Sequence, residues 1–246
     1  MGDETEQGGG RRRVLLKLSG EAMQGDGPGG VDAQTVLRLA REIREAVVGG
    51  VEVAVVVGGG NFWRGQPAAE LGMDRPTADQ VGMLATVMNA LVLQDALESC
   101  GQETRVCSSI RVDEVAEPFI LRRVLRHLER GRVVVVAAGT GRPFFTTDTA
   151  ATLRAIEIQA EVVLKATQVD GVYTADPKTD PTAERLASVT HQEALDRGLK
   201  VMDVTAISLA MENGIPIGVF DLATLGNITR ALLGEKIGSI VESPAS

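Results

Sequence analysis

Short apolar runs alternate with helical patterns along most of the chain. Six runs, most of them rich in Val, Leu and Ile, lie at residues 12–18, 51–57, 103–108, 132–138, 162–166 and 215–220, which is typical of strands covered on both faces. Apolar residues recur with helical spacing at 36–47, 79–98, 148–160, 203–211 and 228–233, and a further helix is expected to open at Pro118. The alternation predicts an α/β fold, a three-layer α/β/α sandwich with a mostly parallel central sheet.

Polar residues mark several of the expected helix starts. Asp32 and Asp203 each precede a helical pattern and are expected to be N-caps, and Thr190 and Glu193 have the spacing of a capping box. Asp148 also stands near a helix start, so an N-cap role alone would explain that carboxylate.

The length and composition predict one packed domain. The chain has 246 residues, of which 44% are hydrophobic and 24% charged, the balance of a globular protein with a substantial core. We expect residues 1–11 to be a flexible tail, because Gly8, Gly9 and Gly10 favour disorder at a terminus, and residues 12–246 to form a single domain.

Charge and residue usage argue against several classes of partner. The 33 acidic residues outnumber the 25 basic ones, and aromatic residues are few, so nucleic acid is not an expected partner. No apolar run approaches the roughly 18 residues of a membrane span, and residues 1–13 lack the apolar region of a signal peptide. Cys100 and Cys107 have no metal-ligand spacing and are expected to be reduced thiols, so a cytoplasmic protein is predicted.

Three glycine-bearing loops each follow an expected strand, at residues 17–20, 58–65 and 139–148. In a parallel sheet all three would open at the same edge, where backbone amides can approach phosphate oxygens. Lys17 and Arg64 are cations suited to phosphoryl transfer. Each loop could instead be only a tight turn, and Arg64 could be only a surface residue. Lys17 is harder to explain in this way, because it lies within an apolar strand, where an unpartnered lysine is rare.

Other short motifs carry less weight. Residues 25–30 fit G-x-G-x-x-G but do not stand directly between a strand and a helix, and Pro28 interrupts them. The chain has neither a P-loop motif nor the catalytic-loop motifs of protein kinases. His127 and His191 lie in polar helical contexts and are expected at the surface.

Longer motifs extend these loops in a characteristic order. They comprise residues 17–22 (KLSGEA), 58–61 (GGGN) with Arg64-Gly65, 82–89 (GMLATVMN), 139–148 (GTGRPFFTTD) and 165–177 (KATQVDGVYTADP). Together they resemble the bacterial uridylate kinases, or UMP kinases, of the amino acid kinase superfamily, from about Arg13 to Ile240. The resemblance implies an enzyme that transfers the γ-phosphoryl group of ATP to UMP, giving UDP for pyrimidine nucleotide (CTP) biosynthesis.

The resemblance also implies roles for individual residues. Lys17, Arg64 and Asp148 would be catalytic, Asp148 by organising the cations, with Asp203 as a second orienting carboxylate. ATP would be bound by Lys17, Leu18, Ser19, Gly20, Gly60, Arg64, Thr167, Tyr173 and Asp176. UMP would be bound by Gly59, Asp79, Thr140, Gly141, Arg142, Pro143, Phe144, Phe145, Thr146 and Thr147. Mg²⁺ would arrive with ATP rather than in a protein cage, since no cluster of carboxylates is evident.

Regulation and assembly follow from the resemblance alone. Members of this family are typically homohexamers, and many are activated by GTP and inhibited by UTP. The segment Gly25, Asp26, Gly27, Pro28, Gly29 and Gly30 resembles the part linked to GTP activation. The apolar helix expected at 79–98 is a candidate for subunit packing as well as for the core.

Two positions depart from the family pattern, and two other functions remain open. Arg142 stands where Asn is frequent, which bears on recognition of the base, and Gln168 stands where Lys or Asn is common. One alternative is a sister kinase with a carboxylate or carbamate acceptor. The other is a non-catalytic nucleotide-binding storage or regulatory protein of the same fold. Asp79 and the 140–148 segment favour a nucleotide acceptor, and the joint presence of Lys17, Arg64 and Asp148 favours catalysis.

Overall fold

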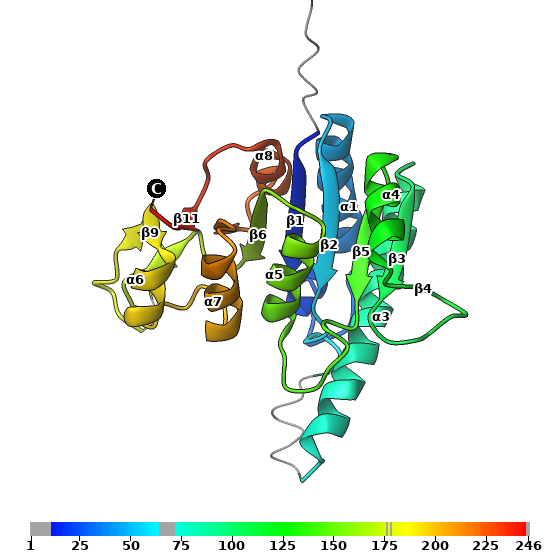
Figure 1. The fold of residues 1–246 in the computed structure, drawn as a ribbon, viewed down its shortest axis with the longest axis horizontal. Helices are drawn as coiled ribbons and strands as arrows, with labels where there is room; N and C mark the ends of the chain where they lie inside the picture. The colour runs from blue at the N-terminus through cyan, green and yellow to red at the C-terminus, as the bar shows by residue number, and fades with distance from the viewer. Residues whose placement is uncertain (1–10, 64–71, 176, 178, 245–246) are drawn as a thin grey trace, which may run out of the picture.

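The structure is a computed structural model that describes residues 11–63, 72–175, 177 and 179–244. A nine-stranded sheet lies at its centre, and Figure 1 shows how the helices are arranged around it. The strand order is β4-β3-β5-β2-β1-β6-β10-β11-β9, and every neighbouring pair is parallel except β10 and β11. The strands are β1 (Arg13–Leu18), β2 (Glu52–Val57), β3 (Thr104–Ser108), β4 (Glu117–Pro118), β5 (Val133–Ala137), β6 (Val162–Thr167), β9 (Ser188–Thr190), β10 (Ile217–Asp221) and β11 (Ser239–Glu242). A separate hairpin joins β7 (Val172–Tyr173) to β8 (Arg185–Leu186).

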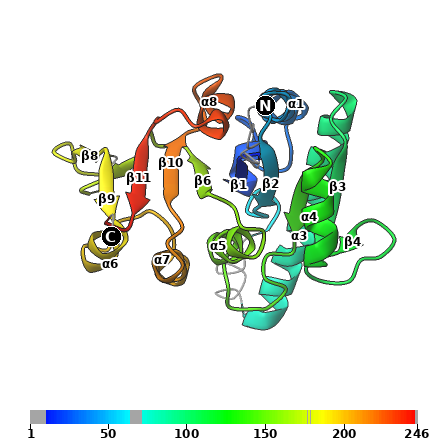
Figure 2. The same ribbon diagram turned by 45° about the horizontal axis from the view of Figure 1, so that its top comes forward.

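Helices cover both faces of this sheet, which confirms the predicted α/β architecture (Figure 2). One core cluster joins the sheet to α1 (Ala33–Val48), α3 (Arg75–Ser99) and α8 (Asn227–Leu233). The other joins it to α4 (Leu121–Glu129), α5 (Thr147–Glu157), α6 (His191–Asp196) and α7 (Val204–Glu212). A short 3-10 helix, η1 (Gly20–Met23), follows β1.

Side chains alternate between the two faces of the sheet along β1, and this alternation determines the face on which Lys17 lies. Leu16 and Leu18 belong to the core beneath α1, whereas Leu15 belongs to the core beneath α5. Lys17 is two residues after Leu15 and so lies on the same face of the strand, pointing toward α5. It lies near the carboxyl end of its strand, the edge at which parallel sheets place ligands.

The predicted N-caps are confirmed at three helices. Asp32 accepts from the Thr35 amide at 2.7 Å, Thr190 from that of Glu193 at 3.0 Å, and Asp203 from that of Ala206 at 3.0 Å. Each satisfies an amide that has no partner within its own helix.

Other helix boundaries differ from the prediction. Pro118 does not open a helix: it lies in edge strand β4, opposite Ser108, and α4 begins at Leu121. An edge strand tolerates proline because its outward amide needs no partner. Helix α3 begins at Arg75 rather than residue 79, with Asp74 as its N-cap, and α5 ends at Glu157.

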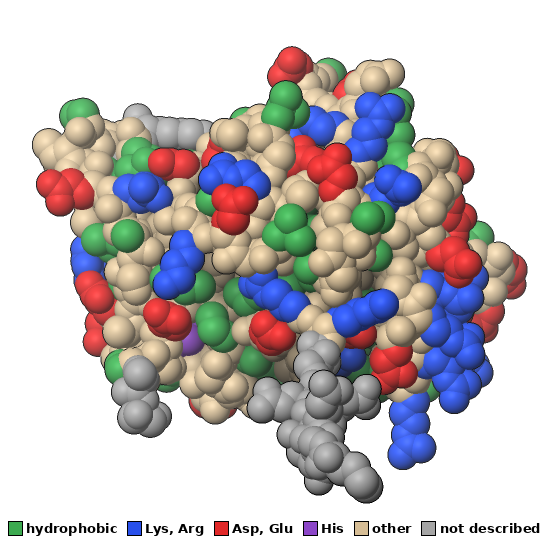
Figure 3. Space-filling view, turned by 90° about the horizontal axis from the view of Figure 1, so that it is seen from above, with side chains coloured by type: hydrophobic (Ala, Val, Ile, Leu, Met, Phe, Trp, Pro, Cys, Tyr) green, Lys and Arg blue, Asp and Glu red, His purple; other side chains and the backbone are tan. Residues whose placement is uncertain are grey.

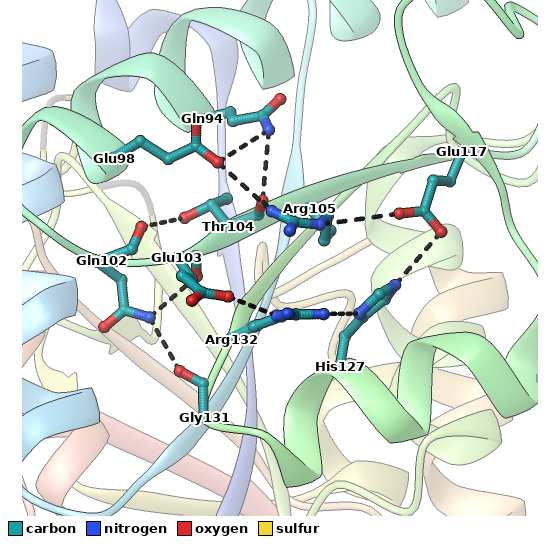
Figure 4. A network of polar contacts seen from close by, with 10 residues as sticks. All are labelled: Gln94, Glu98, Gln102, Glu103, Thr104, Arg105, Glu117, His127, Gly131 and Arg132. Carbon is teal, nitrogen blue, oxygen red and sulfur yellow. Dashed lines mark hydrogen bonds and ion pairs between the residues drawn. The ribbon is translucent and has the colours of Figure 1, made fainter.

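The histidines also differ from the prediction of two surface residues. His191 is buried, and its ring nitrogens contact the Ile215 carbonyl and the Ser243 hydroxyl, each at 3.1 Å. His127 is half-buried in a polar network between β3, β4 and α4, where it contacts Glu117 at 3.3 Å and Arg132 at 3.2 Å (Figure 4). Arg105 completes the network through Glu98 and Glu117. The polar partners of both histidines come from other elements.

Helix α3 differs from the expectation that no run approaches the length of a membrane span: by length and composition it could cross a membrane, although core helices of soluble proteins meet the same criteria. Its residues Met83, Val87, Leu93 and Leu97 pack in the core beneath α1. Elsewhere the surface is mixed: Figure 3 shows acidic and basic side chains interspersed over one face, with basic ones gathered at its right-hand edge.

Candidate functional site

Two lysines and one carboxylate form a compact charged cluster at the carboxyl ends of β1 and β6. Lys17 and Lys165 are register partners on these parallel strands. Asp148 on α5 contacts both: its Oδ1 lies 2.8 Å from Lys17 Nζ and its Oδ2 lies 2.8 Å from Lys165 Nζ. Lys165 also donates to the Val201 carbonyl at 2.6 Å. We call these three residues the lysine-aspartate cluster.

The cluster is largely buried, and this affects its protonation. Burial by itself raises the pKa of Asp148, but attraction from Lys17 and Lys165 outweighs it and leaves that pKa below its ordinary value. Burial, together with repulsion from Lys17, lowers the pKa of Lys165 despite its contact with Asp148. Asp148 is therefore ionised at neutral pH and holds two cations side by side.

Asp148 is not the N-cap of its helix, so the plainer interpretation of this residue is wrong. The N-cap of α5 is Thr146, whose hydroxyl accepts from the amides of Asp148 and Thr149 at 3.0 and 3.2 Å. The carboxylate of Asp148 is thereby left to the two lysines. Asp203 lies next to this helix start and accepts from the hydroxyls of Thr146 and Thr149.

The first two glycine loops pack directly against each other. A Cβ atom at Gly20 would lie 2.5 Å from the backbone nitrogen of Gly60, so only glycine permits this approach. Asn61 and Asn89 bind each other through both amide groups, and Asn89 also donates to the Gly58 carbonyl at 2.7 Å. These contacts fix the loop after β2 to helix α3.

A pocket of about 170 Å³ opens beside the lysine-aspartate cluster; we call it the Thr140 pocket. Six predicted UMP-binding residues beyond Thr140 line it: Gly59, Asp79, Arg142, Phe145, Thr146 and Thr147. Gly141, Pro143 and Phe144 belong to the same segment but do not line the pocket. Asp79 already accepts from the Phe144 amide at 2.8 Å and pairs with Arg75 at 2.9 Å.

A second pocket, of about 280 Å³, is lined by Tyr173, Arg197 and Lys200 among others; we call it the Tyr173 pocket. Of the predicted ATP-binding residues, Tyr173 lines it, whereas Thr167 lies nearby and accepts from the Val169 amide. The Leu18 side chain is buried in the core, which leaves only its backbone for a ligand. Arg64 and Asp176 lie outside the described residues.

Each pocket has a lining residue next in sequence to the cluster or to its backbone partner. Thr147 of the Thr140 pocket is adjacent in sequence to Asp148, and Lys200 of the Tyr173 pocket is adjacent to Val201, which binds Lys165. The predicted effector segment Gly25–Gly30 contributes no residue to either lining, and the Gly30 amide donates to the Asn61 carbonyl at 3.0 Å.

Lys165 is the main residue that the sequence reasoning missed. The signal that singled out Lys17, a lysine inside an apolar strand, is also present in residues 162–166. Thr86 was missed as well: its hydroxyl accepts from the Ala138 amide at 2.6 Å, and it lines the Thr140 pocket. The order of residues offers no signal for that contact, because the two residues lie 52 positions apart.

Comparison with known proteins agrees with this geometry. The model of the amino acid kinase family matches residues 12–221. A solved UMP kinase from Bacillus anthracis is 38% identical and superposes with a TM-score of 0.91, covering 96% of this chain and 97% of its own. A UMP kinase from Ureaplasma parvum is 36% identical (TM-score 0.89, 95% and 99% covered), and a uridylate kinase from Archaeoglobus fulgidus is 32% identical (TM-score 0.72, 93% and 99%).

Proposed function

The chain belongs to the amino acid kinase family, and from that premise we propose that it transfers the γ-phosphoryl group of ATP to UMP, giving ADP and UDP. The observation that carries the proposal is the lysine-aspartate cluster, in which one carboxylate holds two cations near the carboxyl ends of β1 and β6. Two ammonium groups held side by side are suited to a reaction that brings two phosphate groups together.

Charge neutralisation and positioning are the main tasks of such an enzyme. The acceptor is a phosphate monoester whose second pKa is about 6, so its attacking oxygen is anionic at neutral pH without a protein base. Lys17 and Lys165 would offset repulsion between the two anions and the charge that develops on the transferred group. Asp148 would hold both ammonium groups in place, an orienting role rather than that of a base.

We assign the Thr140 pocket to UMP and the Tyr173 pocket to the adenine nucleotide. The lining residues support this assignment. Most predicted UMP-binding residues line the Thr140 pocket, and Tyr173, which the resemblance assigns to ATP, lines the other. Gly20 and Gly60 would present backbone amides to the ATP phosphates, and Arg64 would add a cation there. Asp203 would support the start of α5 through Thr146 and Thr149.

Mg²⁺ would enter as a complex with ATP. Within residues 11–63, 72–175, 177 and 179–244, no group of three or more His, Cys, Asp or Glu side chains is placed to hold a metal ion. A phosphate-bound Mg²⁺ that keeps several waters needs no such cage. The ion would supply further charge neutralisation on the phosphates.

A cytoplasmic, oligomeric enzyme of pyrimidine nucleotide biosynthesis is the setting we propose. Leu84, Met88 and Val92 form an exposed apolar stripe on α3, with exposed fractions of 49%, 48% and 37%. A stripe at i, i+4 and i+8 is suited to packing against another helix, which supports assembly into a homo-oligomer, a hexamer by family resemblance. GTP as activator, through residues 25–30, and UTP as inhibitor also rest on the resemblance.

The test is ADP production from Mg-ATP with UMP, CMP, dCMP, AMP and GMP in parallel with acetylglutamate, aspartate and carbamate. We expect strong turnover confined to UMP, with Arg142 leaving base choice intact. Turnover only with a carboxylate or carbamate would make the chain a sister kinase. Binding of ATP without turnover of any acceptor would favour a storage or regulatory protein.

A further inference from the structure

The segment that leads from β5 into α5 has an unusual backbone. Four of its residues have positive φ: Ala138 at 61°, Gly139 at 55°, Gly141 at 76° and Phe144 at 71°. Such angles are unfavourable for Ala and Phe, whose Cβ atoms crowd the backbone. Conformations of this kind persist only where surrounding structure imposes them. The same segment supplies Gly139, Thr140 and Arg142 to the Thr140 pocket.

Side chains from other elements hold this segment along its length. Thr86 binds the Ala138 amide and Asp79 binds the Phe144 amide. Asp203 accepts from the Thr146 hydroxyl at the far end. A further attachment is Ser109, whose hydroxyl donates to the Gly139 carbonyl at 2.7 Å. Ser109 also packs against Gly141, where a Cβ atom would lie 2.7 Å from the Ser109 carbonyl oxygen.

Arg154 determines the direction of the Ser109 hydroxyl. Its Nη2 donates to Ser109 Oγ at 3.0 Å, so the hydroxyl accepts there and its own hydrogen is free for Gly139. The Arg154 guanidinium stacks on the Phe119 ring, 3.9 Å from its centroid, and pairs with Glu157 at 2.5 Å. Only 7% of Arg154 is exposed, and such burial fixes its orientation.

We propose that Ser109 and Arg154 are positioning residues for the acceptor, acting through the Gly139 carbonyl on the shape of the Thr140 pocket. This inference rests on the proposed function, because it takes the Thr140 pocket as the UMP site. Neither residue lines that pocket. The effect should fall on UMP rather than ATP, since the held segment contributes no residue to the Tyr173 pocket.

Ser109→Ala removes the hydroxyl and leaves the rest of the side chain in place. We expect the KM for UMP, and the Kd for UMP from calorimetry, to rise about 3- to 10-fold, the range of one net hydrogen bond. The KM for ATP should change less than 2-fold. Ser99→Ala is the matched control, because it removes a similar hydroxyl whose hydrogen bond lies elsewhere. Ser99 Oγ donates to the Ala96 carbonyl at 2.8 Å, at the carboxyl end of α3. It should leave the KM and Kd for UMP unchanged.

A double-mutant cycle with Arg154→Met tests the link between the two residues. If both act through one hydrogen bond, the increases in Kd for UMP will be less than additive in their logarithms. An unchanged Kd for UMP in Ser109→Ala, or an equal rise in the KM of both substrates, would overturn the proposal. Failure of the unaltered protein to phosphorylate UMP would instead contradict the proposed function, so the two failures are distinguishable.

Discussion

Lys17 and Lys165 stand directly opposite each other on adjacent parallel strands, and their two like charges share the single carboxylate of Asp148. Like charges placed opposite each other in a sheet are normally unfavourable. Here the arrangement depends on Asp148, which lies on α5 above the pair. Because the cations are already in place before substrates bind, little reorganisation is needed when phosphates arrive.

Replacing Lys17 should abolish most turnover without unfolding the protein. In Lys17→Ala, Asp148 keeps Lys165 as a partner, so no buried charge is left alone. We expect kcat to fall by about 100-fold or more, the usual loss when one donor to transition-state charge is removed. The measurement is steady-state ADP release with saturating UMP and Mg-ATP. Lys236→Ala, at an exposed lysine, is the control, and a fall of less than 3-fold in Lys17→Ala would contradict the assigned role.

Acid should remove the stabilisation that Asp148 provides. The pKa of Asp148 in the folded protein lies below its ordinary value of 3.8, since attraction from both lysines outweighs the effect of burial. The ionised carboxylate therefore stabilises the fold above about pH 4, and this contribution is lost as the pH falls through the lower folded pKa.

Chemical unfolding of Asp148→Asn across pH 2 to 8 measures this contribution. We expect the variant to be less stable by about 3 kcal/mol near pH 7, since two buried cations lose their counter-charge. The difference should shrink as the pH falls below about 4, because the carboxylate is protonated first in the unfolded chain and then, at its lower folded pKa, in the folded protein. Asp113→Asn, at an exposed carboxylate, should show no such trend. A difference that is constant across the whole range would refute this account.

Charge on the exposed stripe of α3 should disrupt assembly. Met88 lies in the middle of this stripe, and Met88→Glu would require a carboxylate to be buried between subunits. We expect sedimentation velocity to show smaller species than the unaltered protein at the same concentration. Val48→Glu, at an apolar residue that is 72% exposed on α1, is the control. Identical sedimentation of Met88→Glu and the unaltered protein would exclude this stripe as a subunit contact.

Glycine at residue 159 should stabilise the protein. Gln159 follows the C-cap of α5 with φ at 57°, a conformation in which glycine lacks the steric cost of a side chain. We expect Gln159→Gly to raise the free energy of unfolding by about 0.5 to 1 kcal/mol in urea titration. Gln192→Gly, within α6, should lower it by a similar amount. A loss of stability in Gln159→Gly would show that the Gln159 side chain contributes more to the free energy of unfolding than the strain of its positive φ costs.

The central strands could be predicted because the apolar character that marks each of them lies within its own stretch of sequence. Each of the six apolar runs coincides with a strand to within two residues, since a strand covered on both faces needs apolar residues along most of its length. The remaining strands escaped prediction: β4, β7 and β8 have two residues each, and β9 and β11 are short and partly polar. Pairing with neighbours creates them, as for β11, which runs antiparallel to β10.

The site could be predicted only in part for a similar reason. Lys17 was recognisable because an apolar strand seldom holds an unpartnered lysine. Its partner in register, Lys165, lies 148 positions away and becomes significant only once β1 is placed beside β6. Likewise, nothing local to Asp79 indicates that it binds the Phe144 amide, and nothing local to His191 indicates that Ile215 and Ser243 cover it.

The place of β1 in the sheet has a consequence for how the protein is made. This strand is synthesised before the other strands of the sheet, yet it lies between β2 and β6, and the latter ends at residue 167. Chain synthesis proceeds at about 5 to 20 residues per second, so β1 waits on the order of ten seconds for its second neighbour. Until then Lys17 faces neither Asp148 nor Lys165. A nascent chain that stops before β6 therefore cannot assemble the cluster, which makes catalytic competence a late event in synthesis.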